Sequence, residues 1–393
     1  MRDIGLAAFS LFFMQDPSFL AHQKRLQKGR RTSNCQTLFG MKKIPTPNHI
    51  RKHLDGISPS HFDDMFAQAV KTFAAEDNLE SFRLLGGHTL IALDGTEYFS
   101  SYKVHCDNCS HRNLKNKKTQ YFHTFLSATI VSPGNRHVLP LPPEFMVPQD
   151  GHNKQDSEPM AAKRWLEKHG SQYVDLKPIY LGDDLYSKHP MCTAIRAAGG
   201  NFILTCKPDS HKTLFEYLQG VDLPEYIRTV REGKKTVFHR YTWRCDIPIR
   251  DGGDAAKVNF MQLEIINEKD EVTYRTSFVT DLPVNQENVV EMVSCGRTRW
   301  KIENESFNVL KNNGYNLEHN FGHGQETLAA VLVVLNLLAF AFHSVCDFLE
   351  EAWKLAREVL NTRRAFFEQF RVATFYFIFP TWEKFMHALV HPP

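Results

Sequence analysis

Apolar and polar residues follow two different patterns along the chain, and these divide it into helical and strand-rich parts. Residues 1–84 place apolar positions at helical spacing, as in His61–Phe73, with Pro45 and Pro47 as breaks. After Gly86-Gly87, short apolar runs bounded by polar residues take over. Such runs are typical of buried strands. The pattern therefore predicts a helical region followed by an α/β domain.

The first part of the predicted catalytic core, residues 85–211, contains five short apolar runs that we interpret as strands of a mixed sheet. They are Thr89–Thr96, Thr119–Val131, Arg136–Leu141, Pro178–Gly182 and Asn201–Cys206, with helices predicted over Lys154–His169 and Ser187–Ala198. Residues 212–285 change to longer strands at Thr236–Ile249, Asn259–Asn267 and Glu271–Thr280, joined by polar turns. We predict an antiparallel β insertion there.

The chain from residue 286 onward is expected to be helical, with a second part of the core at 286–345 and a C-terminal helical region at 346–393. Leu328–Phe342 is strongly apolar, but it is shorter than the ~20 residues that a membrane span needs and contains Asn336. We predict a buried central helix and no membrane association. Leu6–Met14 lies between Asp3 and Asp16, so we do not predict a signal peptide.

Arg299–Lys311 contains no glycine or proline, which favours a helix. On a regular helical wheel the apolar half holds Trp300, Ile302, Phe307, Val309 and Leu310, whereas Lys301 and Glu305 lie on the polar half. Glu303 and Arg299 interrupt the apolar arc one turn apart. They form either a structural ion pair at helical spacing or part of a site in which Glu303 meets a cation.

Two of the predicted strands end in carboxylates. Asp94 ends the run that begins at Thr89, and Asp183-Asp184 ends the run that begins at Pro178. A single Asp at a strand end is often only a cap for the next helix, whereas carboxyl ends of adjacent parallel strands form sites in α/β proteins. Together with Glu303 these residues predict a three-carboxylate site for two Mg²⁺ or Mn²⁺ ions. Such ions activate a water or a 3′-hydroxyl in phosphoryl transfer.

Three motifs in this chain resemble those of bacterial insertion-sequence DDE transposases. They are Leu93-Asp94-Gly95-Thr96, Gly182-Asp183-Asp184-Leu185-Tyr186 and Arg299-Trp300-Lys301-Ile302-Glu303 followed by Lys311. The similar group has an RNase-H-like catalytic domain and a β insertion before the Glu, and the resemblance spans about residues 85–345. Asp183 lies 89 positions after Asp94, and Glu303 lies 120 after Asp183.

The resemblance implies a catalytic and metal-binding triad of Asp94, Asp183 and Glu303, and it implies that Arg299 and Lys311 hold transposon-end DNA. Asp183 is preferred over Asp184 because it stands three positions before Tyr186, and Glu303 over Glu305 because of the wheel. The chain departs from the family at Gly296, where the family usually has Tyr, and at Lys311, which lies eight rather than seven positions after Glu303. The implied function is cut-and-paste transposition by an oligomer acting on paired double-stranded DNA ends.

The charge distribution suits a DNA partner. Residues 1–60 hold ten Lys and Arg against three Asp and Glu, although the whole chain has a net charge of only +3. The densest basic run, predicted to bind DNA, contains Lys24, Arg25, Arg30 and Arg31. Trp243 in the β insertion is a candidate for stacking on a flipped base, as in related enzymes; the alternative is a core tryptophan.

The eight cysteines are scattered, which excludes a disulfide scaffold and favours reduced thiols in a bacterial cytoplasm. Cys106 and Cys109 form a Cys-x-x-Cys pair, which zinc would suit if His111 or His123 completed the set. The alternative is a reduced loop without metal. Two other functions use the same features: a metal-dependent nuclease without strand transfer, and a non-catalytic DNA-binding protein derived from a transposase.

Overall fold

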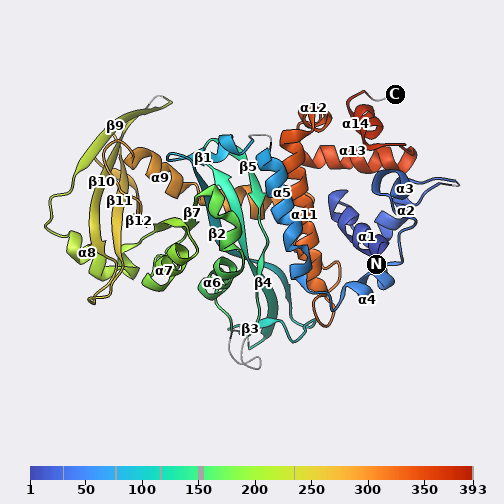
Figure 1. The fold of residues 1–393 in the computed structure, drawn as a ribbon, viewed down its shortest axis with the longest axis horizontal. Helices are drawn as coiled ribbons and strands as arrows, with labels where there is room; N and C mark the ends of the chain where they lie inside the picture. Colours follow the sequence, from blue (N-terminus) through green and yellow to red (C-terminus); the bar gives the residue numbers. More distant parts are fainter. Residues whose placement is uncertain (30, 76–77, 116, 149–154, 234, 392–393) are drawn as a thin grey trace.

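The computed structural model describes residues 1–393 except 30, 76–77, 116, 149–154, 234 and 392–393. The molecule is elongated, with an antiparallel β part at one end, a central sheet covered by helices, and a helical part at the other end (Figure 1). Both termini lie in the helical part (Figure 1). The predicted α/β class is confirmed: a 12-stranded mixed sheet with flanking helices.

The central strands are the five that the apolar runs predicted. β2 (His88–Ser101) pairs antiparallel with β4 (Thr119–Ser132) and parallel with β7 (Pro178–Gly182), which pairs parallel with β8 (Asn201–Thr205). β5 (Asn135–Pro140) pairs with the far side of β4. Three short strands add to this framework: β1 (Arg83–Leu84), β3 (Ser110–Asn113) and β6 (Glu144–Met146). Strands buried on both faces read as continuous apolar runs, which explains why the sequence revealed them.

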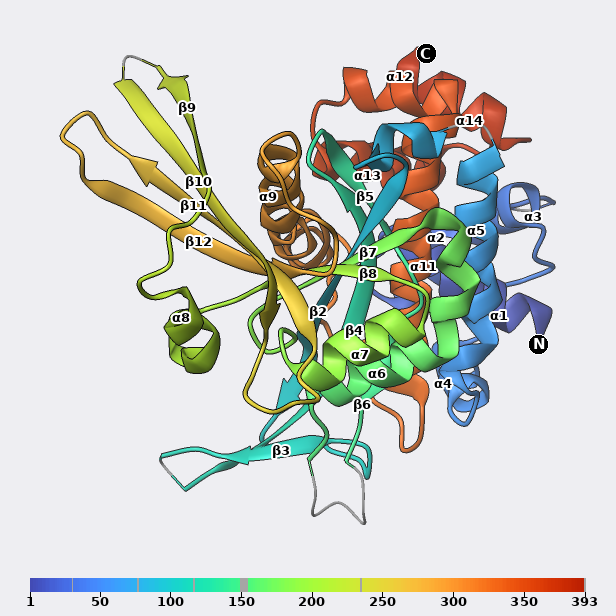
Figure 2. The same ribbon diagram turned by 60° about the vertical axis from the view of Figure 1, so that its left-hand side comes forward.

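The predicted β insertion forms four antiparallel strands: β9 (Glu225–Glu232), β10 (Lys235–Pro248), β11 (Lys257–Ile266) and β12 (Val272–Thr280). β12 also pairs antiparallel with β8, with Phe278 opposite Thr205, so the insertion extends the central sheet (Figure 2). The short helix α8 (Lys212–Leu218) precedes it. β9 was not predicted, because this edge strand is largely exposed and lacks an apolar run.

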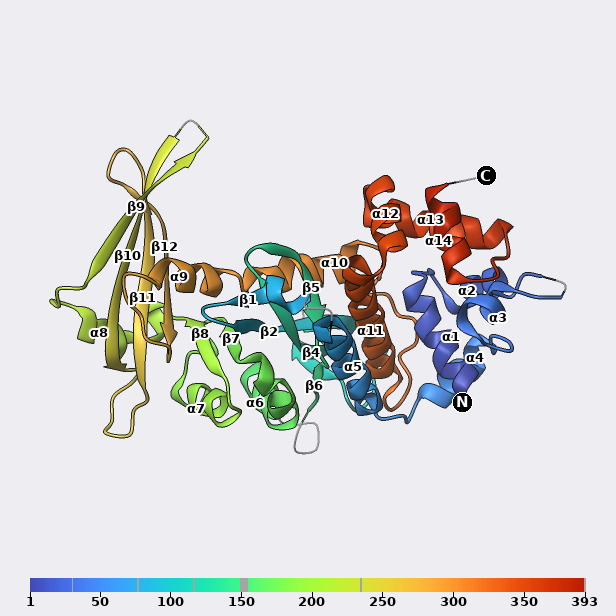
Figure 3. The ribbon, with the colours of Figure 1, turned by 45° about the horizontal axis from the view of Figure 1, so that its top comes forward.

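Helices cover the sheet on both sides. α6 (Glu158–His169) and α7 (His189–Ala197) lie side by side on one face, and α9 (Val289–Arg297) lies on the other, against β8 and β10 (Figure 2). α9 continues through a π-helical segment, Ile302–Phe307, into α10 (Asn308–Asn312), and the chain then returns to α11 (Leu328–Leu349) (Figure 3).

The helical part combines the two ends of the chain. α1 (Arg2–Phe13), α2 (Phe19–Leu26), α3 (Asn34–Phe39) and α4 (Pro47–Leu54) share one hydrophobic core with α12 (Glu351–Val359), α13 (Arg363–Tyr376) and α14 (Trp382–Val390). α5 (Asp63–Ala75) instead contributes Phe66 and Phe73 to the core of the sheet. The packing thus groups the predicted 1–84 and 346–393 regions together, apart from α5.

α11 separates the two hydrophobic cores and contributes to both. By length and composition it is the one helix in the described residues that is long and apolar enough to cross a membrane, with a mean hydropathy of 2.3. However, 78% of that apolar window is buried inside the protein. The prediction of a buried central helix is therefore confirmed.

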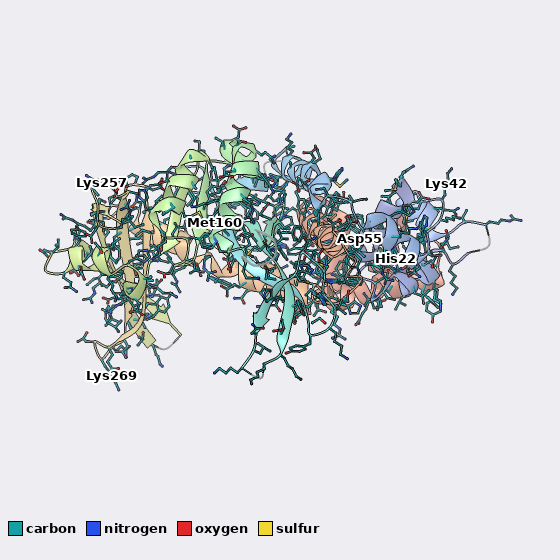
Figure 4. All side chains as sticks on the ribbon, turned by 90° about the horizontal axis from the view of Figure 1, so that it is seen from below. His22, Lys42, Asp55, Met160, Lys257 and Lys269 are labelled. Atoms are coloured by element: carbon teal, nitrogen blue, oxygen red, sulfur yellow. The ribbon has the colours of Figure 1, made fainter. Side chains whose placement is uncertain are left out.

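The start of α11 is held by Asp55, which is labelled in Figure 4. Its carboxylate accepts hydrogen bonds from the backbone N–H groups of residues 325–328 at 2.8–3.0 Å. Burial raises the pKa of Asp55, but these four donors outweigh it and lower the pKa. Asp55 therefore stabilises the folded protein above its ordinary pKa of 3.8. This stabilisation is lost as the pH falls through the lowered pKa of the folded state.

Asp55→Ala is expected to destabilise the protein by about 1–2 kcal/mol, because four amides at a helix start lose their acceptor. Urea denaturation at pH 7 measures this loss. Asp55→Asn keeps an oxygen acceptor without the charge and is expected to cost less than Asp55→Ala. Equal losses in the two variants would contradict a hydrogen-bonding role.

Candidate active site

Asp94 and Asp183 belong to two adjacent parallel strands, but only Asp183 lies at a strand end. The prediction that the first strand ends at Asp94 is wrong, because β2 continues to Ser101 through its antiparallel pairing with β4. Ala92 of β2 pairs with Leu181 of β7, so Asp94 and Asp183 follow two positions later on neighbouring strands. Asp94 is still within β2, opposite Ser127 of β4, whereas Asp183 begins the turn after β7. The Oδ1 atom of Asp183 accepts a hydrogen bond from the Leu185 N–H at 2.8 Å, which fixes its side chain in that turn.

Arg299 joins the helix to the first strand. Its guanidinium donates to Asp94 Oδ2 at 3.0 Å and to Glu303 Oε1 at 2.7 Å. The structural ion pair of Arg299 and Glu303 is therefore present, and it extends to Asp94. The same contact brings Glu303 to the carboxylate of Asp94, while a metal cation at Glu303 stays a prediction.

The carboxylates lie close enough to shift one another's protonation. Burial raises the pKa of Asp94; the Arg299 guanidinium lowers it, and the charges of Glu158, Glu303 and Asp183 raise it further, to about 7. Burial lowers the pKa of Arg299, but Glu303, Asp94 and Asp183 raise it more. One guanidinium thus fails to neutralise the negative charge gathered here, and a further cation would be bound favourably.

Glu158 is a fourth carboxylate of this site that the sequence analysis did not identify. It lies in the first turn of α6 and accepts a hydrogen bond from the Tyr186 hydroxyl at 2.6 Å. Burial raises its pKa, and the charge of Asp183 adds to that rise. A Cβ atom at Gly95 would meet the Glu158 carboxylate at its present position, so any larger residue there would require the Glu158 side chain to move. Glu158 could not be recognised from the sequence, because acidic residues are common in the first turn of a helix whether or not they belong to a site.

The rivals of the chosen carboxylates lie in other surroundings. Asp184 accepts hydrogen bonds from the Lys207 N–H at 2.7 Å and from the Ser210 hydroxyl at 2.5 Å, so it holds the turn after β8. Glu305 is not among the groups that shift the pKa of Asp94; its charge instead raises the pKa of Lys301, which burial lowers more. The geometry favours Asp183 and Glu303 as the members of the site.

The predicted wheel does not hold for this segment. Glu303, placed in the apolar arc, is exposed, whereas Glu305, placed on the polar half, is partly buried, so the wheel does not support the choice between them. Trp300, expected on the apolar half, is 44% exposed, and Lys301, expected on the polar half, is 6% exposed. The reason is that α9 ends at Arg297 and the helix resumes with a π-helical segment, whose wider turns shift the register. The Lys301 ammonium is satisfied by backbone carbonyls of the turn between β4 and β5, including Ser132 at 2.7 Å.

Two DNA-binding candidates near the site have protein partners. Lys311 lies on α10, and its ammonium pairs with the Glu318 carboxylate at 2.9 Å. Trp243 lies in β10 and is only 9% exposed, within the core of the sheet. This is the alternative that the sequence analysis left open for Trp243, and in this conformation its ring offers no free face to a base.

The basic run near the N-terminus is only partly accessible. Lys24 and Arg31 are exposed, whereas Arg30 lies outside the described residues. Arg25 was predicted to bind DNA, but it is buried and forms an ion pair with Asp16, with its Nε atom 3.1 Å from Oδ1. His22, labelled in Figure 4, donates its Nδ1–H to the same carboxylate at 2.6 Å. The prediction for Arg25 is therefore wrong: it holds α2 in the helical core.

The donor set of the site fits a hard divalent cation. Asp94, Asp183 and Glu303 supply only carboxylate oxygens, which Mg²⁺ and Mn²⁺ prefer. The pKa of Asp94 is raised first by burial and then by the neighbouring carboxylates, so a cation beside it would favour its charged form. Burial of such charges is costly without a counter-ion. Each of the four carboxylates already accepts a hydrogen bond: Glu158 from Tyr186, Asp183 from Leu185, and Asp94 and Glu303 from Arg299.

The Cys-x-x-Cys pair lies apart from these carboxylates in the chain. Cys106 and Cys109 meet His123 of β4 and His323 of the segment before α11. His111, the other candidate, is bonded to the side chain of Gln155 instead. His323 was missed because it lies more than 200 positions away in the sequence.

Comparison with protein-family models finds no match, and comparison with curated protein sequences finds no significant match. The structure defines a mixed α/β protein in which Asp94, within β2, and Asp183, directly after β7, lie just beyond the residues through which these two strands pair in parallel.

Proposed function

We propose that this chain is a metal-dependent DNA nuclease and strand transferase of the DDE transposase class, with Asp94, Asp183 and Glu303 as its catalytic carboxylates. The single observation that carries the proposal is the Arg299 bridge, which joins Glu303 to Asp94 beside Asp183. The motifs that resemble the family thus meet at one place, although they lie far apart in the sequence.

The strand arrangement supports the same proposal. β5, β4 and β2 form an antiparallel trio, followed by the parallel strands β7 and β8, and helices connect the parallel strands. This order is the one expected of an RNase-H-like domain with β9–β12 as the insertion before the Glu helix, and it supports the proposal. The carboxylates occupy the first strand, the end of the fourth and the late helix, as such a domain would require.

In the proposed reaction a water oxygen attacks a phosphodiester at the end of the element. A new P–O bond forms, the bond to the departing 3′-oxygen breaks, and that oxygen takes up a proton. The freed 3′-hydroxyl then attacks a second phosphodiester. Two Mg²⁺ or Mn²⁺ ions held by Asp94, Asp183 and Glu303 would favour deprotonation of the attacking group and neutralise the leaving oxygen.

The protein's own residues orient this chemistry. Arg299 fixes the carboxylates of Asp94 and Glu303 relative to each other, and it provides positive charge beside a phosphate. The exposed Trp300 and the partly exposed Glu303 leave this side of the helix open to DNA. Because two element ends must be joined, we propose that the chain acts as a homo-oligomer on paired double-stranded DNA ends.

The test uses a labelled DNA fragment that carries the sequence bordering the chain's own coding region, incubated with Mg²⁺ or Mn²⁺. Wild type is expected to cleave it and to join the freed 3′ end. Asp183→Asn and Glu303→Gln are expected to lose at least about 10³-fold in rate, because each removes a metal ligand. Glu305→Gln, two positions from Glu303, serves as the matched control and should retain activity.

Cleavage without joined or hairpin products would replace the proposal with a nuclease that lacks strand transfer. If the protein binds this DNA but does not cleave it with either Mg²⁺ or Mn²⁺, the proposal is replaced by a DNA-binding protein derived from a transposase. Loss of activity in Glu305→Gln but not in Glu303→Gln would overturn the assignment of the helix carboxylate.

A further inference from the structure

Four soft ligands converge on one point beside the central sheet. Cys106 and Cys109 lie in the loop between β2 and β3, His123 lies in β4, and His323 lies in the segment between α10 and α11. Their sulfur and nitrogen atoms all lie within 4.8 Å of one another. Three separate stretches of the chain thus contribute to one cluster.

The distances match a tetrahedral site. The Sγ atoms of Cys106 and Cys109 are 3.9 Å apart. The Nε2 atom of His123 lies 3.5 Å and 3.3 Å from these sulfurs, and that of His323 lies 3.8 Å from Cys109 Sγ. Zinc with Zn–S bonds of about 2.3 Å and Zn–N bonds of about 2.0–2.1 Å separates two sulfurs by about 3.8 Å, and sulfur from nitrogen by about 3.5 Å.

Aromatic side chains pack against both histidine rings and help to hold them in place. Tyr98 stacks on the His123 ring with centroids 5.5 Å apart, and Phe99 packs on the His323 ring at 4.4 Å. Cys109 and His123 are buried. An apolar wall with two thiols and two imidazoles suits zinc rather than the hard ions of the carboxylate site.

A disulfide does not explain the cluster. A disulfide bond requires its two sulfurs to lie about 2.05 Å apart, well short of the separation observed between Cys106 and Cys109. A disulfide between Cys106 and Cys109 would also not account for the position of the two imidazoles beside their sulfur atoms. The convergence of both histidines on the thiols is the observation that a metal ion accounts for.

We propose that Cys106, Cys109, His123 and His323 bind one structural zinc ion. Four protein ligands fill the tetrahedral positions, so the ion has no open position for a substrate and serves to hold the fold. It fastens the segment between α10 and α11 to the hairpin of β2 and β4. The Asn108 side chain reinforces this connection by donating to the Glu326 carbonyl at 2.7 Å.

The zinc site would constrain the helix that carries Glu303 from its C-terminal side. The chain leaves α10 at Asn312 and reaches His323 only eleven residues later. Fixing His323 against β4 shortens the free path of this connection and removes conformational freedom from the unfolded chain. The site is distinct from the carboxylate site in its ligands, so it stands independently of the proposed function.

The experiment measures zinc content in the full-length chain, purified under reducing conditions from cells supplied with zinc. Wild type is expected to contain one zinc per chain. Cys109→Ala and His323→Ala are expected to retain less than about a tenth of that, because loss of one of four ligands weakens binding strongly. His319→Ala, which removes a histidine of the same segment outside the cluster, is the matched control and should keep full occupancy.

A second measurement covers the case in which the alanine variants do not fold. His323→Cys keeps four ligands and should retain zinc, and wild type stripped by a chelator should bind Co²⁺ with the intense visible absorption of a tetrahedral thiolate site. Wild type that contains no zinc, and takes up neither Zn²⁺ nor Co²⁺ when reduced, would overturn the proposal. So would full zinc occupancy in folded Cys109→Ala. Neither readout depends on DNA cleavage.

Discussion

Asp94→Asn is expected to abolish DNA cleavage and, at the same time, to raise the stability of the metal-free protein above pH 7. The activity should fall by at least about 10³-fold, because the variant loses a charged metal ligand. The gain in stability follows from the raised pKa of Asp94, which burial and three neighbouring carboxylates cause despite Arg299. Removing a charge that the folded protein disfavours removes its cost.

The sign and size of this effect depend on pH. The pKa of Asp94 rises from 3.8 in the unfolded chain to about 7 in the folded protein. The folded state therefore holds this proton more tightly, and stability falls as the pH rises from about 4 to 7. Above pH 7 the cost reaches at most about 4 kcal/mol. We expect Asp94→Asn to recover about 1–2 kcal/mol of this cost. The recovery is incomplete because an amide forms a weaker hydrogen bond with Arg299 than a carboxylate does.

Urea denaturation at pH 8 with a chelator measures this gain, and the same experiment at pH 5.5 should show a smaller difference between variant and wild type. Mg²⁺ should stabilise wild type by mass action but not Asp94→Asn. Glu305→Gln is the control and should change stability by less than about 0.5 kcal/mol. An Asp94→Asn protein less stable than wild type at pH 8 would show that the Arg299 pair outweighs the repulsion among the carboxylates.

The sequence predicted correctly those features whose structure is determined by residues close to them in the chain. The central strands followed from apolar runs buried on both faces, and Asp94 and Asp183 followed from their position at the ends of those runs. The order of the strands brings the two aspartates to adjacent positions. Gly95 was part of a motif, but its closeness to the Glu158 carboxylate depends on a helix more than 60 residues away.

What the sequence did not reveal depends on distant partners. A basic run has the same pattern whether its charges meet solvent or a buried carboxylate, so the pairing of Arg25 with Asp16 in the helical core was not predictable. His323 joins its cluster through a contact across 200 residues. The register change at Lys301 arises because a π-helical segment allows the ammonium to reach three carbonyls, a tertiary effect that a regular wheel omits.

The second large effect is expected at Asp347, on α11, which connects the sheet to the helical part. Its buried carboxylate accepts a hydrogen bond from Trp353 Nε1 at 2.7 Å, and it lies 3.3 Å from His137 Nδ1 and 3.4 Å from the guanidinium of Arg363. These partners lie on α12, β5 and α13 respectively. One side chain thus fastens elements of both hydrophobic cores.

Asp347→Ala is expected to destabilise the protein by about 3 kcal/mol, because it leaves the partly buried Arg363 with the Tyr315 hydroxyl but without its carboxylate. Burial raises the pKa of Asp347, but the His137 hydrogen bond and the charge of Arg363 outweigh it and lower the pKa to about 2. The stabilisation of the folded protein by the Asp347 carboxylate is therefore fully present above pH 4, and it is lost as the pH falls through about 2. The difference from wild type should be constant between pH 5 and 8 and should shrink below pH 4.

Glu368→Ala provides the contrast, since Glu368 forms an exposed pair with Arg364 on the same helix as Arg363. That pair should contribute less than about 0.5 kcal/mol because water and salt screen it. Thermal and urea denaturation of the two variants at pH 7 decide the comparison. If Asp347→Ala costs less than about 1 kcal/mol, the cluster is not what holds α11 to its neighbours, and the apolar contacts of the two cores alone fasten the helical part to the sheet.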